Sequence, residues 1–460
     1  MATRQGVYAG YTLFPTPHGE SAVNVTGTDA GPQAEPGFRN QRGAPPLVGL
    51  AWALLVVNTL GSLGVETVVP IPRPLLQMIT MGSLGVAFVL ALLLNPRLRV
   101  RPSAFLLLMS LLLLVSIVSS SFLESGLGAL VRCARQAIFI ATLWLLTRWW
   151  DGSLAFVRHH IRALGAVLGS VALGLVVAPG IARPADFDGR LVGVLWPITA
   201  TQVADYAAVV AGLVLVLWLA RGSSGWSTVG IVLPAIALLL LTHTRTAAVG
   251  LVVAVTVAGL TLALVNARAR RALAVMALCA GLIAVAFAAP LVTWFQRGQD
   301  EDALSNLTGR QKVWDLLLAE ERTLHQQLFG VGLTDKSFAG LPIDSTWLAV
   351  YYEQGLVGVA LIVMIMAGLV FTTALRPPSP ARACAVFLLV YCLIASYTQV
   401  GLGDVTGYLL HLVVAATLLT AAGPTVGIPS TSAQIPASTM SRDSAPPWPS
   451  HTVDHSTRPR

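Results

Sequence analysis

Long apolar stretches alternate with short polar connections over most of this 460-residue chain. A helix needs about 20 apolar residues to cross the hydrocarbon core of a bilayer. Twelve stretches approach or reach that length: about 46–64, 75–94, 103–123, 127–147, 163–181, 201–220, 228–243, 246–266, 272–293, 346–374, 383–400 and 405–422. The seventh is short, and the tenth is long enough to begin as a surface helix. The pattern predicts an all-α polytopic integral membrane protein with about twelve transmembrane helices.

Composition agrees with this class and narrows the chemistry. Hydrophobic residues make up 55% of the chain and charged residues only 11%, whereas a soluble domain carries about 25% charged residues. The cysteines all fall inside apolar stretches and form no Cys-x2-Cys pair; they are Cys133, Cys279, Cys384 and Cys392. This spacing predicts neither a disulfide framework nor a metal site, and we expect no cofactor.

The two ends of the chain differ in composition from the apolar middle. Residues 1–44 are polar and rich in Gly and Pro, without the apolar core of a signal peptide, and residues 423–460 are rich in Ser, Thr and Pro. Such segments bury too little apolar surface to fold alone. We therefore expect two disordered cytoplasmic ends around a transmembrane domain at residues 45–422.

Arginine positions predict how the chain is oriented. Every second connection carries arginine: residues 95–102, 148–162, 221–226, 266–272 and 376–382. Cytoplasmic loops of membrane proteins are enriched in Lys and Arg, so these connections and both termini are predicted to be cytoplasmic. This explains the net charge of +8 without a nucleic-acid partner. The medium connection 182–200 and the long connection 294–344 are then external, and a connection as long as the second is usually functional.

Several arginines lie on the predicted external side, against this bias: Arg132, Arg135, Arg190, Arg245 and Arg310. Arg245 stands in a short polar segment, Thr-His-Thr-Arg, between two apolar stretches, where a charge costs roughly 2.5–3.5 kcal/mol at the bilayer centre. Guanidinium groups pair bidentately with phosphate oxygens, so arginines that converge would suit a pyrophosphate. The alternative is that each one reaches lipid headgroups or pairs with an acid. For Arg245, the two flanking apolar stretches leave the side chain little room to move, which favours contact with an anion.

The order of five motifs resembles a known family. They are DGRLVGVLWPITATQVADYAA (188–208), LTHTRTAAVGL (241–251), LTGRQKVW (307–314), FGVGLTD (329–335) and IDSTWLAVYYEQGLVG (343–358). Over about residues 188–360 this series resembles the O-antigen ligase and O-antigen polymerase superfamily. The resemblance implies transfer of a glycan from a polyprenyl pyrophosphate carrier to a glycan or surface acceptor, at the outer face of the cytoplasmic membrane. It also implies contact with membrane lipid and with other glycan-assembly proteins, and neither a metal nor a nucleotide.

The resemblance carries roles to individual residues. Arg245 matches the family's Ser/Thr-x-Arg arginine, Arg310 its Gly-Arg arginine, and Arg190 the arginine before the sixth apolar stretch; all three would stabilise the leaving pyrophosphate. Asp344 is the candidate base for the acceptor hydroxyl. Ligases of this family typically have His near this position, so Asp344 favours a polymerase. Direct displacement at the anomeric carbon would invert its configuration.

Further residues are candidates for contact with the pyrophosphate or the sugar: Arg132, Arg135, His243, Trp314 and Trp347. A structural role is an open alternative for His243, and both tryptophans are of a type common at membrane interfaces.

Two other functions compete with glycan transfer. A twelve-span solute transporter or lipid-linked glycan flippase would need ionisable residues within the membrane, and Asp205 in the sixth apolar stretch is the main candidate. The two halves of the chain show no convincing repeat, and the unexplained charges lie at the predicted external surface. A non-catalytic scaffold for glycan assembly would not need the arginine set.

Overall fold

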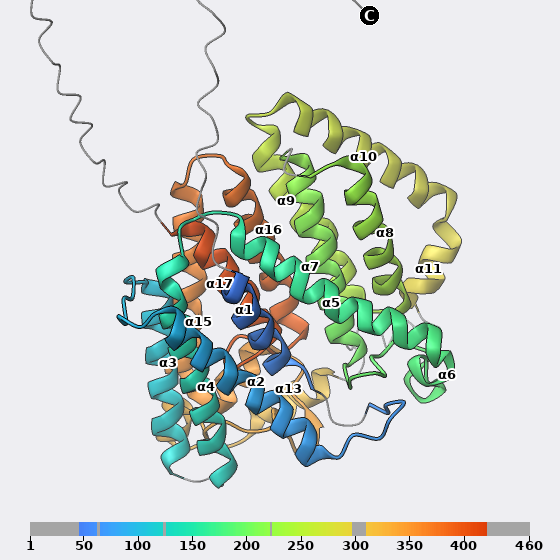
Figure 1. Ribbon diagram of the computed structural model, residues 1–460. Helices are drawn as coiled ribbons and strands as arrows, with labels where there is room; N and C mark the ends of the chain where they lie inside the picture. The colour runs from blue at the N-terminus through green and yellow to red at the C-terminus, as the bar shows by residue number, and fades with distance from the viewer. Residues whose placement is uncertain (1–45, 62–64, 123–125, 221–222, 297–309, 421–460) are drawn as a thin grey trace, which may run out of the picture. The chain divides into compact units, whose positions relative to one another are not determined.

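The computed structural model describes residues 46–61, 65–122, 126–220, 223–296 and 310–420, which form a bundle of helices (Figure 1). The predicted terminal segments, 1–44 and 423–460, lie outside the described residues. So do residues 297–309 of the long connection, including Gly309 of the Gly-Arg motif.

The described elements are almost all helical. The long apolar helices are α1 (Pro46–Thr59), α2 (Arg73–Leu94), α3 (Ala104–Ser121), α4 (Leu127–Leu146), α5 (Ala155–Val177), α7 (Ala200–Leu219), α8 (Gly225–Leu241), α9 (Arg245–Ala263), α10 (Ala267–Ala286), α15 (Thr346–Leu375), α16 (Pro380–Thr398) and α17 (Gly407–Leu419). Shorter elements are η1 (Thr147–Trp149), α6 (Pro179–Ala182), η2 (Ala185–Phe187), α11 (Ala288–Gln296), α13 (Arg310–Ala319), α14 (Leu324–Phe329), and the antiparallel pair β1 (Ser337–Phe338) and β2 (Leu341–Pro342).

Each of the predicted apolar stretches overlaps one of the long helices. Within the described ranges, nine helices are long and apolar enough to cross a membrane, and α1, α8 and α17 are shorter apolar helices. The chain is therefore an all-α protein of the multi-pass membrane type. The count of twelve spans stays a prediction.

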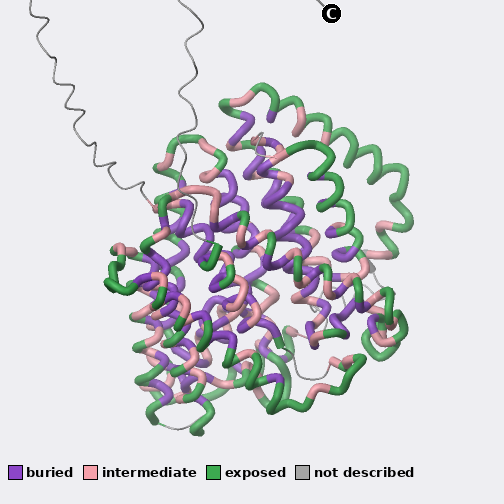
Figure 2. Tube along the Cα trace, in the orientation of Figure 1, coloured by how far each residue is buried: buried purple, intermediate pink, exposed green. Residues whose placement is uncertain are grey.

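Burial differs sharply between helices, as Figure 2 shows. Of the most apolar part of α7, 83% is buried inside the bundle, against 6% for α10. Side chains such as Val275, Leu278 and Leu282 on α10 are exposed. Because lipid tails are as apolar as leucine, such a surface carries no penalty in a bilayer.

Two helices differ from the sequence-based boundaries. We predicted a connection at residues 148–162 before an apolar stretch at 163–181, which is wrong in its second half because α5 already begins at Ala155. The charged side chains there lower the local hydropathy, but His160 between them faces the core and is fully buried. The tenth stretch is divided, because α15 is broken at Gly355, whose φ is 65°; a surface position for the part before the break stays a prediction.

Four connections gather at one end of the bundle, which we call the loop end and which points downward in Figure 1. They comprise residues 182–199, 242–244, 310–345 and 399–406. Backbone hydrogen bonds tie them together: Leu191 donates to Leu241 and Gly332 donates to Glu353, each at 3.0 Å. At the other end, Arg101 donates to the carbonyl of Trp150. The functional candidates therefore share one end, and the arginine-rich connections occupy the other.

Candidate functional site

A cavity of about 200 Å³ lies at the loop end, between α7, α16 and α17; we call it the arginine cavity. Its lining residues are Thr59, Thr201, Gln202, Asp205, Tyr206, Arg310, Asp344, Thr398, Gln399, Val400, Thr406, Gly407 and Tyr408. Small-molecule sites typically measure roughly 300–1,000 Å³. The arginine cavity therefore has room for the reacting part of a substrate and not for a whole oligosaccharide.

Arg310 and Asp344 form an ion pair at the wall of this cavity. Arg310 is the first residue of α13, and its Nε donates to Asp344 Oδ2 at 3.1 Å. The two side chains are 28% and 41% exposed, so both remain accessible to a bound molecule. The fold thus joins two predicted site residues from the third and fifth motifs of the series.

Arg190 lies close to this pair and is fixed to the predicted polar segment between α8 and α9. Its Nε donates to the carbonyl of Thr242 at 3.0 Å, and its Nη2 donates to Thr244 Oγ1 at 3.2 Å. Burial lowers the pKa of the Arg190 guanidinium, and the positive charge of Arg310 lowers it further. The carboxylates of Asp188 and Asp344 act in the opposite direction. Two like charges held this close create a potential that favours an anion.

Arg245 begins α9 beside the same cavity. The residue before it, Thr244, is bonded to Arg190, and the residue after it, Thr246, accepts a hydrogen bond of 2.9 Å from Thr398 in the cavity wall. A helix N-terminus carries a partial positive charge and free backbone N–H groups that suit a phosphate. Arg245 therefore adds its charge where the helix already favours an anion.

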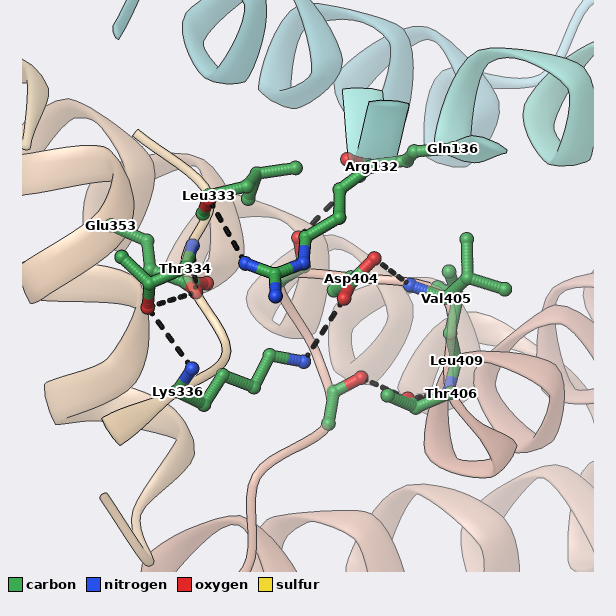
Figure 3. Close-up of polar contacts among 12 residues, drawn as sticks. Arg132, Gln136, Leu333, Thr334, Lys336, Glu353, Asp404, Val405, Thr406 and Leu409 are labelled. Carbon is green, nitrogen blue, oxygen red and sulfur yellow. Dashed lines mark hydrogen bonds and ion pairs between the residues drawn. The ribbon is translucent and has the colours of Figure 1, made fainter. Parts of the chain in front are cut away.

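Arg132 and Arg135 belong to a second group, which we call the anchor cluster: Arg132, Arg135, Lys336, Glu353 and Asp404. Figure 3 shows Arg132, Lys336, Glu353 and Asp404 of this cluster. Arg132 Nη1 donates to the carbonyl of Leu333 at 3.2 Å, and Lys336 Nζ donates to Asp404 Oδ2 at 3.2 Å. Arg135 Nη2 donates to the carbonyl of Asn58 at 2.6 Å. Both arginines thus hold the protein's own backbone, and their contact with pyrophosphate stays a prediction.

The anchor cluster fixes the segment after α14 to two helices. Glu353 Oε1 accepts hydrogen bonds from the backbone N–H and the hydroxyl of Thr334, at 2.8 and 2.9 Å. Burial opposes ionisation of the Asp404 carboxyl, but the charges of Lys336 and Arg135 outweigh burial, so its pKa lies below the ordinary value. Asp404 is thus an ionised structural partner of Lys336.

The remaining predicted residues make packing contacts outside the cavity lining. The His243 ring lies 6.2 Å from the ring of Trp294, and the Trp314 ring packs edge-on against Tyr397 at 5.6 Å. Trp347 Nε1 donates to Ser396 Oγ at 3.1 Å. Their role in binding a substrate stays a prediction.

Sequence reasoning missed four polar residues at or near this end: His160, Lys336, Asp404 and His411. Lys336 is one of two lysines in the chain, and Asp404 is the only acid in the glycine-rich connection before α17. Both features were visible in the sequence and could have marked Lys336 and Asp404 as candidates. His160 and His411 gave none, because a histidine within an apolar helix is ordinarily a packing residue.

Within the ranges that the structure describes, no group of three or more His, Cys, Asp or Glu side chains is placed to hold a metal ion. Comparison of the chain with protein-family models and with curated proteins finds no match.

Proposed function

We propose that this protein is a metal-independent membrane glycosyltransferase of the polymerase or ligase type. It transfers a glycan from a polyprenyl pyrophosphate carrier to a glycan or surface acceptor at the outer face of the cytoplasmic membrane. One observation carries the proposal: Arg310 lines a cavity at the end of the bundle away from the arginine-rich connections, and Arg190 and the start of α9 lie next to that cavity.

The chemistry of the cavity follows from its charges. In the transfer, the bond between the anomeric carbon and the pyrophosphate oxygen breaks, and its electron pair stays on that oxygen. Pyrophosphate leaves readily once its charge is stabilised, and fixed guanidinium groups supply that stabilisation. The acceptor oxygen forms the new bond from the opposite side of the sugar, which inverts the anomeric carbon, and its proton passes to a carboxylate.

Surface-glycan profiles of a deletion strain test the proposal. The strain is complemented with wild-type protein or Arg245→Ala at equal membrane levels. Arg270→Ala is the matched control, since Arg270 is exposed at the opposite end. A polymerase is indicated if wild type restores long chains and Arg245→Ala leaves single repeat units on the acceptor. A ligase is indicated if the acceptor stays bare while lipid-linked polymer accumulates.

A normal profile with Arg245→Ala would contradict the pyrophosphate role of Arg245. A transporter or flippase would then become the leading function. The observation behind this alternative is that Asp205 is buried within α7 and bonded to a histidine of α17. Ionisable residues on translocation paths are often placed in this way. An assay for movement of the lipid-linked glycan across proteoliposomes would separate the two functions.

A further inference from the structure

Asp205 is a buried carboxylate at the floor of the arginine cavity. Asp205 is only 2% exposed, and it lines the cavity together with Arg310 and Asp344. Its Oδ2 lies 3.0 Å from His411 Nε2. Its Oδ1 is buried and has no hydrogen-bond partner of ordinary geometry in the described part of the chain. The bond from His411 therefore fixes one oxygen of the carboxylate, which also interacts with the Tyr391 hydroxyl of α16.

A hydrogen-bonded chain continues from Asp205 into the bundle. His411 Nδ1 lies 2.8 Å from His160 Nε2, and Trp52 Nε1 donates to His160 Nδ1 at 3.2 Å. Trp52, His160 and His411 are fully buried, and they come from α1, α5 and α17. A set of three helices thus supports one carboxylate of a fourth.

The chemistry of the indole fixes the direction of every bond in this chain. An indole nitrogen only donates, so His160 Nδ1 must accept and His160 Nε2 must carry the proton. His411 Nδ1 then accepts from His160, which leaves His411 Nε2 to donate to Asp205. Both imidazoles are neutral in this arrangement, and Asp205 is the terminal acceptor.

This direction also limits what the chain can do with a proton. To pass a proton along the chain, His160 would have to take one from the indole of Trp52, which does not release it near neutral pH. The chain therefore anchors Asp205 and does not conduct protons across the bundle. That property fits a fixed catalytic group better than a proton-coupled translocation path.

We propose that Asp205 is the catalytic base of the glycan transfer and that Trp52, His160 and His411 position it. The inference rests on the proposed function. In the step, the acceptor O–H bond breaks, its proton moves to Asp205, and its oxygen bonds to the anomeric carbon as the pyrophosphate departs. Asp344 is the weaker candidate because it is paired with Arg310, and protonation would break that ion pair.

The groups around Asp205 are consistent with this role. Tyr206 lies beside it on α7, Tyr391 and Cys392 face it from α16, and Tyr408 faces it from α17. All four are neutral when protonated. None can replace Asp205 as proton acceptor without first losing its own proton.

The test compares two carboxylates in purified full-length protein in lipid nanodiscs. The donor is the lipid-linked oligosaccharide extracted from the deletion strain, and sugar-free undecaprenyl pyrophosphate is the competing ligand. For Asp205→Asn we expect the single-turnover rate at saturating donor to fall about 10²–10⁴-fold. The inhibition constant of undecaprenyl pyrophosphate should stay within about threefold, because binding relies on the arginines. For Asp344→Asn we expect a rate loss below about tenfold.

Two further pairs of variants guard against misfolding. Asp205→Glu keeps a carboxylate and should transfer at least about tenfold faster than Asp205→Asn. His411→Gln keeps an N–H donor toward Asp205 and should transfer faster than His411→Phe, as expected of a positioning residue. Cys392→Ala, a buried neighbour of the carboxylate, is the matched control and should match wild type.

The outcomes separate the inference from the function beneath it. If Asp205→Asn transfers within threefold of wild type, or Asp344→Asn loses more than Asp205→Asn, Asp205 is not the base and the glycosyltransferase proposal stands. If wild-type protein binds undecaprenyl pyrophosphate but transfers nothing, the proposed function fails and this inference fails with it. Equal rates for His411→Gln and His411→Phe would overturn the positioning role of the chain.

Discussion

Lys336 Nζ lies 3.2 Å from Asp404 Oδ2, although the two residues are 68 positions apart in the chain. The pair joins the segment after α14 to the connection between α16 and α17. The side chains are only 19% and 13% exposed, so neither charge is well solvated. Removing one partner of a buried pair costs about 3–5 kcal/mol, since an uncompensated charge remains.

We expect Asp404→Asn to destabilise the protein more than Lys336→Met. Loss of Asp404 removes the carboxylate that offsets the charges of both Lys336 and Arg135, whereas loss of Lys336 leaves Asp404 with Arg135 as a partner. Thermal unfolding of both variants in the same detergent measures the difference. Equal or reversed losses would show that Arg135 does not share in holding Asp404.

The same pair predicts a pH dependence of stability. The pKa of Asp404 lies below its ordinary value of 3.8, so the unfolded chain binds this proton more readily than the folded one. The contribution of Asp404 is therefore complete above that ordinary value and disappears as the pH falls through the lower folded pKa. The difference in unfolding temperature between wild type and Asp404→Asn should stay constant from about pH 7 to pH 5 and shrink near pH 3. A constant difference over the whole range would contradict the assignment.

Hydropathy located the helices because a bilayer imposes a length and a composition that each segment carries by itself. It failed at the start of α5, where Arg158 and His159 lower the average although His160 is buried. Average hydropathy does not report which face of a helix turns inward.

The site was predictable in its residue types and not in its contacts. Arg190, Arg245 and Arg310 stood out because their positions opposed the arginine bias of the chain. The bonds from Arg190 to Thr242 and Thr244, over 52 and 54 positions, depend on how α7, α8 and α9 pack. The hydrogen-bonded chain from Asp205 to Trp52 likewise depends on the packing of four helices, and no local sequence pattern predicts it.

A further stability prediction concerns the break in α15. Gly355 has φ 65° and ψ −166°, a region open essentially to glycine alone. A Cβ atom there would lie 2.3 Å from the backbone of Leu328. We expect Gly355→Ala to lower the free energy of unfolding by at least about 1–3 kcal/mol. Gly368→Ala is the matched control in the same helix, because a Cβ there meets nothing within 4 Å. If the two variants unfold at the same temperature, the break is not required.

The role of Arg190 can be separated from its charge. Arg190→Lys keeps a cation but loses the two-point hold on Thr242 and Thr244, so we expect about a tenfold loss of transfer. Arg190→Ala also loses the charge, and we expect about a 10²–10³-fold loss. Arg183→Ala serves as control, because Arg183 is exposed in the same connection and donates to the nearby backbone carbonyl of Gly189. Equal losses of transfer for Arg190→Lys and Arg190→Ala would show that the geometry of the guanidinium matters and its charge does not.

Trp52 offers a test of the chain far from the cavity itself. Trp52→Phe keeps an aromatic ring against Phe156, whose ring lies 5.4 Å from that of Trp52, but removes the donor to His160 Nδ1. His160 can then adopt either tautomer, and the bond from His411 to Asp205 is no longer fixed in direction. Loss of one such hydrogen bond is worth about 1 kcal/mol, which corresponds to about a fivefold slower transfer. The measurement is the single-turnover rate of Trp52→Phe, of His411→Phe and of the double variant that carries both substitutions. If Trp52 acts through His411, the Trp52 substitution adds no further loss in the double variant; independent, additive losses would separate Trp52 from the chain.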